Sequence, residues 1–261
     1  MKNSSKFLLI GNMKMNPTNR EEMDAYEVVL EGALQNIFLL TPGREVEIAL
    51  ATPFFYIKSL SENFSGRIAI GTQDISSYEK GSYTGDISAS MAYSEGATFS
   101  LVGHSERRKY HKESNGDIAK KVRALLNTRM NIVLCVGESQ EDRRTQKTES
   151  VIKKQVTECL SNVEEKEISC VSIAYEPIWA VGSDETPTSL EIHSIKKIIQ
   201  NVLCELFGEE GKKVKILYGG SVHSHNLSDT CIVSGMDGAL VGRSSLDPKE
   251  FLYIASQAKI L

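Results

Sequence analysis

The sequence predicts an α/β protein, a (β/α)8 barrel that forms a single domain over residues 1–261. Two observations predict this fold: short, continuously apolar runs recur along the chain, and amphipathic segments separate them. Strands of a parallel sheet covered on both faces are apolar throughout, instead of at every second residue. The expected strands span residues 7–11, 47–51, 68–71, 99–102, 132–136, 171–174, 214–217 and 239–241.

The segments between these runs have helical periodicity. The clearest helices are expected at residues 117–130 and 190–207, the second ending before Gly208. Eight strand–helix units in about 250 residues fit a closed barrel. An open, doubly wound sheet is the alternative, but no G-x-G-x-x-G turn follows the first strand, which disfavours its dinucleotide-binding form.

Composition limits the classes of function. The 261 residues are 41% hydrophobic, and no linker rich in Gly, Ser or Pro divides them. A net charge of −4 provides no basic surface for nucleic acid or anionic lipid, so local donors must hold any anionic ligand. No apolar run is long enough to span a membrane and the polar start is no signal peptide, so a cytoplasmic protein is expected.

The cysteine and histidine patterns predict neither disulfides nor a metal site. The five cysteines are odd in number and form no C-x-x-C pair, which favours reduced thiols: Cys135, Cys159, Cys170, Cys204 and Cys231. His223-Ser224-His225 looks like a ligand pair, but no acidic third ligand stands beside it.

Residues able to carry chemistry follow several of the expected strands. In a barrel of this kind the carboxyl ends of all strands open onto one face. The first strand is followed by Asn12 and Lys14, the fourth by His104 and Glu106, and the sixth by Glu176. The seventh and eighth are followed by the turns Gly219-Gly220-Ser221 and Gly242-Arg243. One face should therefore gather a cation, an imidazole, a carboxylate and two glycine turns.

Glu176 is the candidate general base of this group. Pro177 biases it away from helical backbone angles, so the acid should project from an extended strand end. Taken alone, a Glu-Pro pair at a strand end is more often a solvated carboxylate. The other strand-end residues favour the catalytic interpretation.

These motifs, taken in order from Gly11-Asn12 to Gly242, resemble the triosephosphate isomerase family over essentially the whole chain. The resemblance implies the TIM-barrel fold and interconversion of D-glyceraldehyde 3-phosphate and dihydroxyacetone phosphate. A proton would move between C1 and C2 through an enediol(ate) intermediate, without a cofactor or a metal, in glycolysis and gluconeogenesis. It also implies a homodimer, formed through the loop at residues 73–88 that contains Thr84.

The implied roles agree with the chemistry, because removing a proton beside a carbonyl requires an aimed base and stabilisation of charge on oxygen. Glu176 would be the base. His104, at a helix start whose dipole disfavours imidazolium, would polarise the carbonyl with a neutral N–H. A hydrogen-bonded histidine beside a Ser105 cap is the alternative for this position.

Four further residues complete the implied site. Lys14 would supply positive charge for the phosphate and the enediolate oxygen, with Asn12 as a neutral donor beside it. Glu106 would be an acidic partner in the same site, although a first-turn helix carboxylate explains it too. Cys135 aligns with a cysteine next to the base, and a buried structural thiol explains it equally well.

Backbone N–H groups of Gly182, Ser221 and Gly242 would bind the phosphate, because glycine turns and helix starts let the chain approach an anion. In the turn after the eighth strand, Arg243 stands where the family has a second glycine, and it adds charge there. Whether its guanidinium binds phosphate or folds away is left open by the sequence.

Two further departures from the family pattern stand out. Met13 replaces a tryptophan, one large apolar side chain for another. The lid reads Ser183-Asp184-Glu185-Thr186-Pro187. In the family, the backbone N–H at the position of Pro187 donates the latching hydrogen bond to the tyrosine matching Tyr218, and a proline has no N–H to donate.

Two alternative functions stand beside this interpretation. One is a sister isomerase acting on a phosphorylated tetrulose, suggested by Pro187 and Arg243. The other, from a different class, is a non-catalytic sugar-phosphate-binding barrel. That barrel predicts loss of the base, the histidine or the lysine, and this chain retains Glu176, His104 and Lys14.

Overall fold

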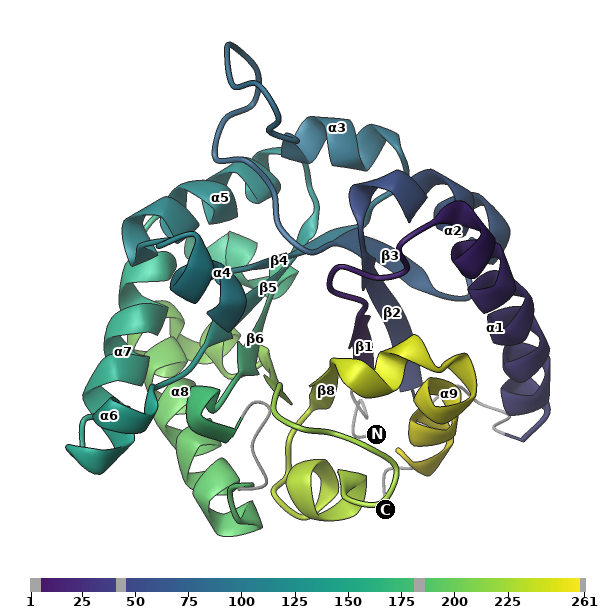
Figure 1. Ribbon diagram of the computed structural model, residues 1–261. Helices are drawn as coiled ribbons and strands as arrows, with labels where there is room; N and C mark the ends of the chain where they lie inside the picture. Colours follow the sequence, from purple (N-terminus) through teal and green to yellow (C-terminus); the bar gives the residue numbers. More distant parts are fainter. Residues whose placement is uncertain (1–5, 41–45, 181–185, 259–261) are drawn as a thin grey trace.

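Eight parallel strands close into a barrel in the computed structural model, which describes residues 6–40, 46–180 and 186–258 (Figure 1). The strands follow one another around the barrel in chain order, and the first pairs with the last. This closed sheet confirms the predicted fold and rules out the open sheet. The strands are β1 (Phe7–Asn12), β2 (Val46–Thr52), β3 (Ala69–Thr72), β4 (Phe99–Val102), β5 (Asn131–Val136), β6 (Val171–Tyr175), β7 (Lys215–Tyr218) and β8 (Gly238–Val241).

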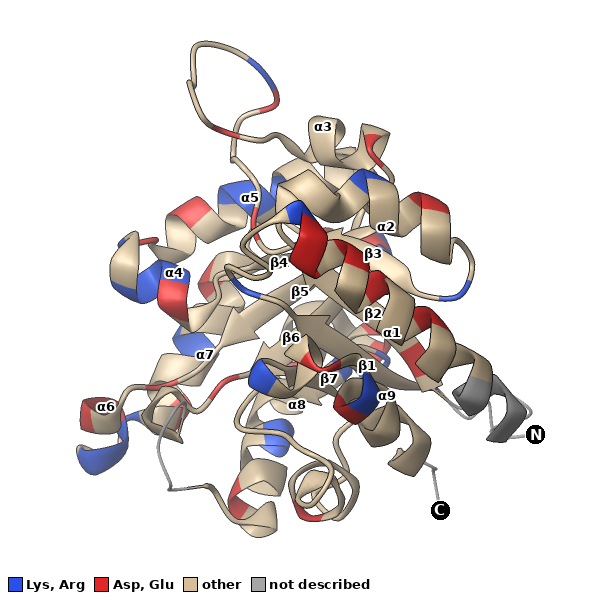
Figure 2. Cartoon of the chain, turned by 45° about the vertical axis from the view of Figure 1, so that its right-hand side comes forward, with Lys and Arg blue, Asp and Glu red and all other residues tan. Residues whose placement is uncertain are grey.

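Helices surround this sheet on its outside (Figure 1). They are α1 (Arg20–Leu40), α2 (Ile57–Phe64), α3 (Ala89–Ser94), α4 (Ser105–Tyr110), α5 (Asn115–Asn127), α6 (Gln140–Arg144), α7 (Thr148–Cys159), α8 (Ser189–Gly211) and α9 (Pro248–Gln257). Short helical turns η1 to η5 cover Phe54–Tyr56, Glu165–Cys170, Ile178–Ala180, Ser228–Ile232 and Arg243–Leu246. Acidic and basic residues are interspersed over the helices of the face in Figure 2. Within the described ranges, no helix is long and apolar enough to cross a membrane.

Local sequence signals explain the helix boundaries. Helix α5 begins earlier than expected because Ser114 and Asp117 form a reciprocal capping box. The expected stop at Gly208 is a kink: Phe207 and Gly208 leave helical geometry, Gly208 with a φ of 54°, and α8 then resumes to Gly211. Most strands are longer than expected by a residue at one or both ends, because pairing with a neighbour continues there.

The barrel is filled by side chains. Its interior cluster comprises buried residues from all strands except β3: Ile10, Ala49, Ala51, Phe99, Leu101, Val133, Cys135, Ala174, Leu217 and Leu240. A larger cluster packs the outer face of the sheet against the helices. At Gly238 a Cβ would lie 2.1 Å from the carbonyl oxygen of Leu8, so the β1–β8 closure requires glycine there.

A buried ionic network ties the loop after β3 to α4 and α5. Lys121 Nζ lies 2.7 Å from Asp74 and 2.6 Å from Glu113, and Arg107 Nε contacts the same two carboxylates at 2.8 and 2.5 Å. Burial raises the pKa of Asp74. Burial also acts to raise the pKa of Glu113, but its bonds to Lys121 and Arg107 lower that pKa overall. The network thus fixes α4, at whose start lie two candidate site residues, His104 at the N-cap and Glu106 in the first turn.

Removing Lys121 should leave these two carboxylates buried without their shared ammonium group. Lys121→Met is expected to lower the free energy of unfolding by about 3 kcal/mol, measured by urea denaturation at neutral pH and fixed protein concentration. The loss should shrink at acidic pH, where Asp74 and Glu113 take up protons.

The neighbouring Lys120 is the matched control, because its side chain is 65% exposed and its contact with Asp117 is 3.9 Å long. Lys120→Met should change the free energy of unfolding by less than about 0.5 kcal/mol. Equal effects of the two substitutions would contradict a special role of the buried network.

Candidate active site

A cavity of about 550 Å³ opens at the carboxyl ends of the strands. It is lined from β1 and its following loop by Asn12 and Lys14, from the β4 end by His104, and from the β6 end by Glu176. The turns after β7 and β8 contribute Gly219, Gly220, Ser221, Gly242 and Arg243. The structure therefore places the predicted strand-end residues that it describes around one cavity. Glu106 is the exception, because it lies just behind the residues that line the cavity.

Glu176 directly follows β6 and is only 2% exposed. Its Oε2 accepts a hydrogen bond from the backbone N–H of Ser105 at 2.9 Å, and its Oε1 lies 3.1 Å from His104 Nε2. Gly219 leaves room for this side chain, because a Cβ there would stand 2.9 Å from Glu176 Cγ. The carboxylate thus lies inside the cavity wall, in contrast to a solvated strand end.

His104 caps the start of α4. Its Nδ1 accepts a hydrogen bond from the backbone N–H of Glu106 at 3.2 Å. A ring nitrogen that accepts carries no proton, so the neutral imidazole has its proton on Nε2. That N–H points at Glu176, as required of a group that donates to an oxygen in the cavity.

Lys14 adopts an unusual backbone conformation, with a φ of 51°. Its backbone N–H donates to Asn12 Oδ1 at 3.0 Å, and its carbonyl accepts from Gln73 Nε2 at 2.7 Å. The ammonium group lies 2.6 Å from Glu106 Oε1. A strained residue held by its neighbours is typical of functional sites.

The glycine turns form the end of the cavity beyond Lys14. A Cβ at Gly242 would lie 3.5 Å from Lys14 Cε, so the lysine stem runs along this turn. Arg243 is exposed and lines the cavity, and no carboxylate among the described residues pairs with it. Gly182, the third expected phosphate-binding position, lies outside the described residues.

A second set of contacts connects the chain after Glu176 to the loop after β5. Trp179 Nε1 donates to Glu138 Oε1 at 2.7 Å, and Tyr175 Oη donates to the same oxygen at 3.1 Å. Burial raises the pKa of Glu138 in spite of these bonds. The guanidinium of Arg143 stacks on the Trp179 ring, 3.5 Å from its centroid. The segment after the candidate base is therefore anchored from a neighbouring strand end.

Several residues in and around the site were not found from the sequence. The Ser105 amide holds Glu176, Gln73 supports the Lys14 backbone, and His223 lines the cavity with a buried, unpaired Nδ1 within the described part. Backbone donors and long-range amides leave no local sequence pattern. His223 belonged to the noted histidine pair, whose rings lie 6.0 Å apart.

The remaining candidates have these positions. Cys135 is fully buried, and burial followed by the nearby Glu176 charge raises the pKa of its thiol well above the usual value. Met13 is fully buried in the core, as the replacement of one apolar side chain by another implies. Pro187 is buried, and the Tyr218 hydroxyl has no hydrogen-bond partner among the described residues. Residues 183–185 of the expected lid lie outside the described ranges.

Comparisons with known proteins agree on one family. The triosephosphate isomerase family model matches residues 7–258. Triosephosphate isomerase of Endomicrobium trichonymphae is 35% identical over 255 residues, covering 97% of this chain and 99% of its own. The Xanthomonas campestris pv. campestris (strain 8004) protein of the same name is 38% identical over 252 residues, covering 96% and 97%.

The solved structure of triosephosphate isomerase from Bartonella henselae superposes with a TM-score of 0.85 at 30% identity, covering 97% of this chain and all of that one. The match in sequence and in fold runs through every strand end that lines the cavity. This chain belongs to the triosephosphate isomerase family.

Proposed function

We propose that this chain is an isomerase that interconverts D-glyceraldehyde 3-phosphate and dihydroxyacetone phosphate, the reaction of its family in glycolysis and gluconeogenesis. One observation carries the proposal. A buried carboxylate, an imidazole N–H and an ammonium group, those of Glu176, His104 and Lys14, line the same cavity.

Glu176 acts as the base that moves a proton between the two carbons. Both of its oxygens are occupied in this structure, by the Ser105 amide and His104. A substrate whose carbonyl takes the His104 N–H frees one oxygen for the substrate C–H. Glu176 is therefore freed to act as a base when His104 binds the substrate carbonyl. Proton removal is in this way coupled to polarisation of the carbonyl.

His104 and Lys14 stabilise the negative charge that develops on oxygen in the enediolate. The imidazole donates from Nε2, and its orientation is fixed by the bond that Nδ1 receives from Glu106. Lys14 brings a full charge and Asn12 a neutral donor. Glu106 positions the Lys14 ammonium group from outside the cavity lining.

The phosphate lies against the backbone of Ser221 and Gly242, with Gly182 as a third donor. Arg243 adds a guanidinium to this end of the cavity. Lys14 is already paired with Glu106, so Arg243 is the cation at the lining whose charge no described carboxylate neutralises. A dianionic phosphate is the complement of such a group.

A homodimer is the proposed assembly. The segment between β3 and α3 stands out from the barrel (Figure 1), and Ser76 closes its base with a 2.6 Å hydrogen bond to Asp86. Tyr78 and Tyr83 stack at 3.7 Å along it, each more than 40% exposed, and Thr84 in the same segment is exposed as well. Aromatic side chains on a protruding, internally bonded loop suit insertion into a second subunit.

We further propose that the enzyme works in the cytoplasm. Its free thiols and the place of the proposed reaction in glycolysis both agree with this compartment. The tetrulose phosphate isomerase remains the second candidate function, because Arg243 and Pro187 depart from the family pattern at the phosphate turn and at the lid.

The base assignment is tested by Glu176→Gln, which keeps the shape of the side chain and removes its basicity. We expect kcat with glyceraldehyde 3-phosphate to fall about a thousandfold in a coupled assay, with the folding transition preserved.

Comparing kcat/KM of the wild type on triose and tetrose phosphates in the same assay separates the two isomerases. Inactivity of the wild type on both sugars would support the non-catalytic barrel.

Arg243→Gly tests the guanidinium at the phosphate end. We expect KM and the inhibition constant for inorganic phosphate to rise about five- to tenfold, with kcat nearly unchanged. Arg144→Ala, at a side chain that is 71% exposed on α6, provides the control. A KM that Arg243→Gly leaves unaltered would show that this guanidinium does not contact the phosphate.

The lid departure is tested with a double-mutant cycle on Tyr218 and Pro187. Because proline has no N–H, Tyr218→Phe should change kcat/KM little in the native chain. In the Pro187→Ala background, where an N–H is restored, the same change should reduce kcat/KM about tenfold. Identical effects of Tyr218→Phe in both backgrounds would disprove a missing latch.

A further inference from the structure

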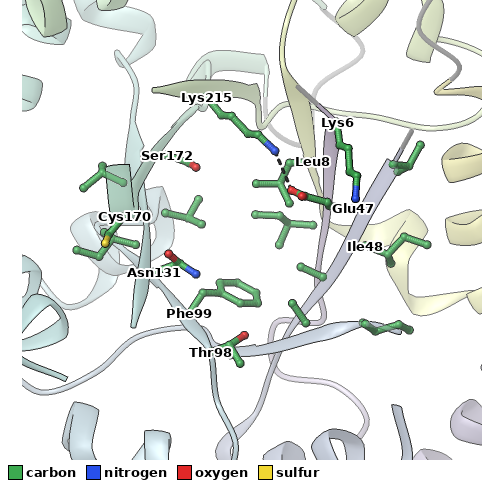
Figure 3. A pocket seen from close by; sticks show the side chains of 18 of the residues that line it. Lys6, Leu8, Glu47, Ile48, Thr98, Phe99, Asn131, Cys170, Ser172 and Lys215 are labelled. Carbon is green, nitrogen blue, oxygen red and sulfur yellow. Dashed lines mark hydrogen bonds and ion pairs between the residues drawn. The ribbon is translucent and has the colours of Figure 1, made fainter. Parts of the chain in front are cut away.

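A second cavity of about 640 Å³ opens at the opposite end of the barrel, where the strands begin. Figure 3 shows Leu8, Phe99, Asn131 and Ser172 around this space, with Lys6, Glu47 and Lys215 at its edge. The volume lies within the range of small-molecule sites, about 300–1,000 Å³. None of the strand-end residues proposed for isomerisation lines it.

The barrel core separates this cavity from the candidate active site. Leu101, Ala174 and Leu217, each fully buried, belong to the cluster that fills the interior between the two openings. The six residues of β1, which runs from one opening toward the other, span about 20 Å along the strand. A ligand at the strand starts therefore cannot reach Glu176, and the two sites are chemically independent.

The floor of the cavity is apolar and its rim is polar. Phe99 and Val133, 4% and 3% exposed, form the floor together with the half-buried Leu8. Asn131 and Ser172 contribute an amide and a hydroxyl to the wall. This combination of an apolar body and a few polar groups is typical of sites for amphipathic small molecules.

The charges at the rim favour an anion. Among the described residues, five charged ones line the cavity and Glu47 is the acidic one of them: Lys6, Glu47, Arg67, Lys213 and Lys215. Three of the four cations have acidic partners. Lys215 pairs with Glu47 at 2.7 Å, Arg67 with Glu31 at 2.7 Å, and Lys213 with Glu210.

Lys6 is the remaining cation, and among the described residues it has no ion-pair or hydrogen-bond partner. It precedes β1, which pairs with β2 so that Leu8 faces Glu47, and therefore lies at the rim next to the Lys215–Glu47 pair. Of the described side chains at this rim, one positive charge is therefore left without a partner. A phosphate dianion would face Glu47 with only that one free cation, whereas a monoanion matches it.

We propose that this cavity binds an organic monoanion with an apolar body, such as an aryl or medium-chain carboxylate. The carboxylate lies at Lys6, beside Lys215, and the apolar body packs on Leu8 and Phe99. Asn131 and Ser172 offer hydrogen bonds to a polar substituent. The proposal does not depend on the isomerase activity.

Calorimetric titration of the folded protein with 4-phenylbutyrate, in phosphate buffer that occupies the active site, tests the proposal. We expect saturable binding that is about five- to tenfold weaker in Lys6→Glu, because the ligand charge then meets a repelling carboxylate. Lys154→Glu, a reversal at a side chain that is 69% exposed on α7, should bind as the wild type does. The uncharged amide of the same compound should bind more weakly than the acid.

The free thiols locate the ligand. Cys170 and Cys204 are both half-buried, but only Cys170 lines this cavity. 4-Phenylbutyrate should slow alkylation of Cys170 by iodoacetamide and leave Cys204 unaffected, as read by peptide mass spectrometry, and phosphate alone should protect neither. Absence of saturable binding, equal binding of acid and amide, or protection of both thiols would each overturn the proposal.

Discussion

The pairing of β1 with β8 is the constraint on which the rest of the molecule depends. It joins residues more than two hundred positions apart and closes the ring, in which every strand points its carboxyl end the same way. Cation, imidazole and carboxylate come from three different strands and meet only because that ring is closed. The closure also leaves no unpaired sheet edge in the described barrel, so all of its strand backbones are bonded to a neighbour on each side. Position within the ring, more than local sequence, determines which residues can act together.

The two ends of the ring are chemically different. At the carboxyl ends, loops, glycine turns and the start of α4 supply donors and a buried carboxylate. At the amino ends, the chain enters the strands with lysines and small polar side chains above an apolar floor. The packed interior between them carries no charge and keeps the two ends apart. A barrel of this kind therefore has room for two unrelated binding events in one fold.

Much of the fold was predictable from the sequence because buried parallel strands are continuously apolar, and this signal located each of the eight strands. The candidate site was predictable for a related reason: Asn12, His104 and Glu176 each stand within two residues of the end of such a run. At Gly208 the sequence predicts the end of a helix, whereas the structure has a kink. A glycine signals a break in a helix but does not show that α8 resumes after it. Contacts between distant segments were beyond local patterns. The Ser105 amide at Glu176, the Gln73 bond to Lys14 and the Lys121 network depend on which loops the barrel places side by side.

The left-handed backbone conformation of Lys14 is set during folding and not during substrate binding. For a residue with a Cβ this conformation costs about 1–2 kcal/mol, and the hydrogen bonds with Asn12 and Gln73 hold it. The conformational entropy of orienting the ammonium group is lost when the chain folds. In the proposed reaction, the substrate meets an ammonium group that is already in place, and the backbone strain does not recur with each turnover.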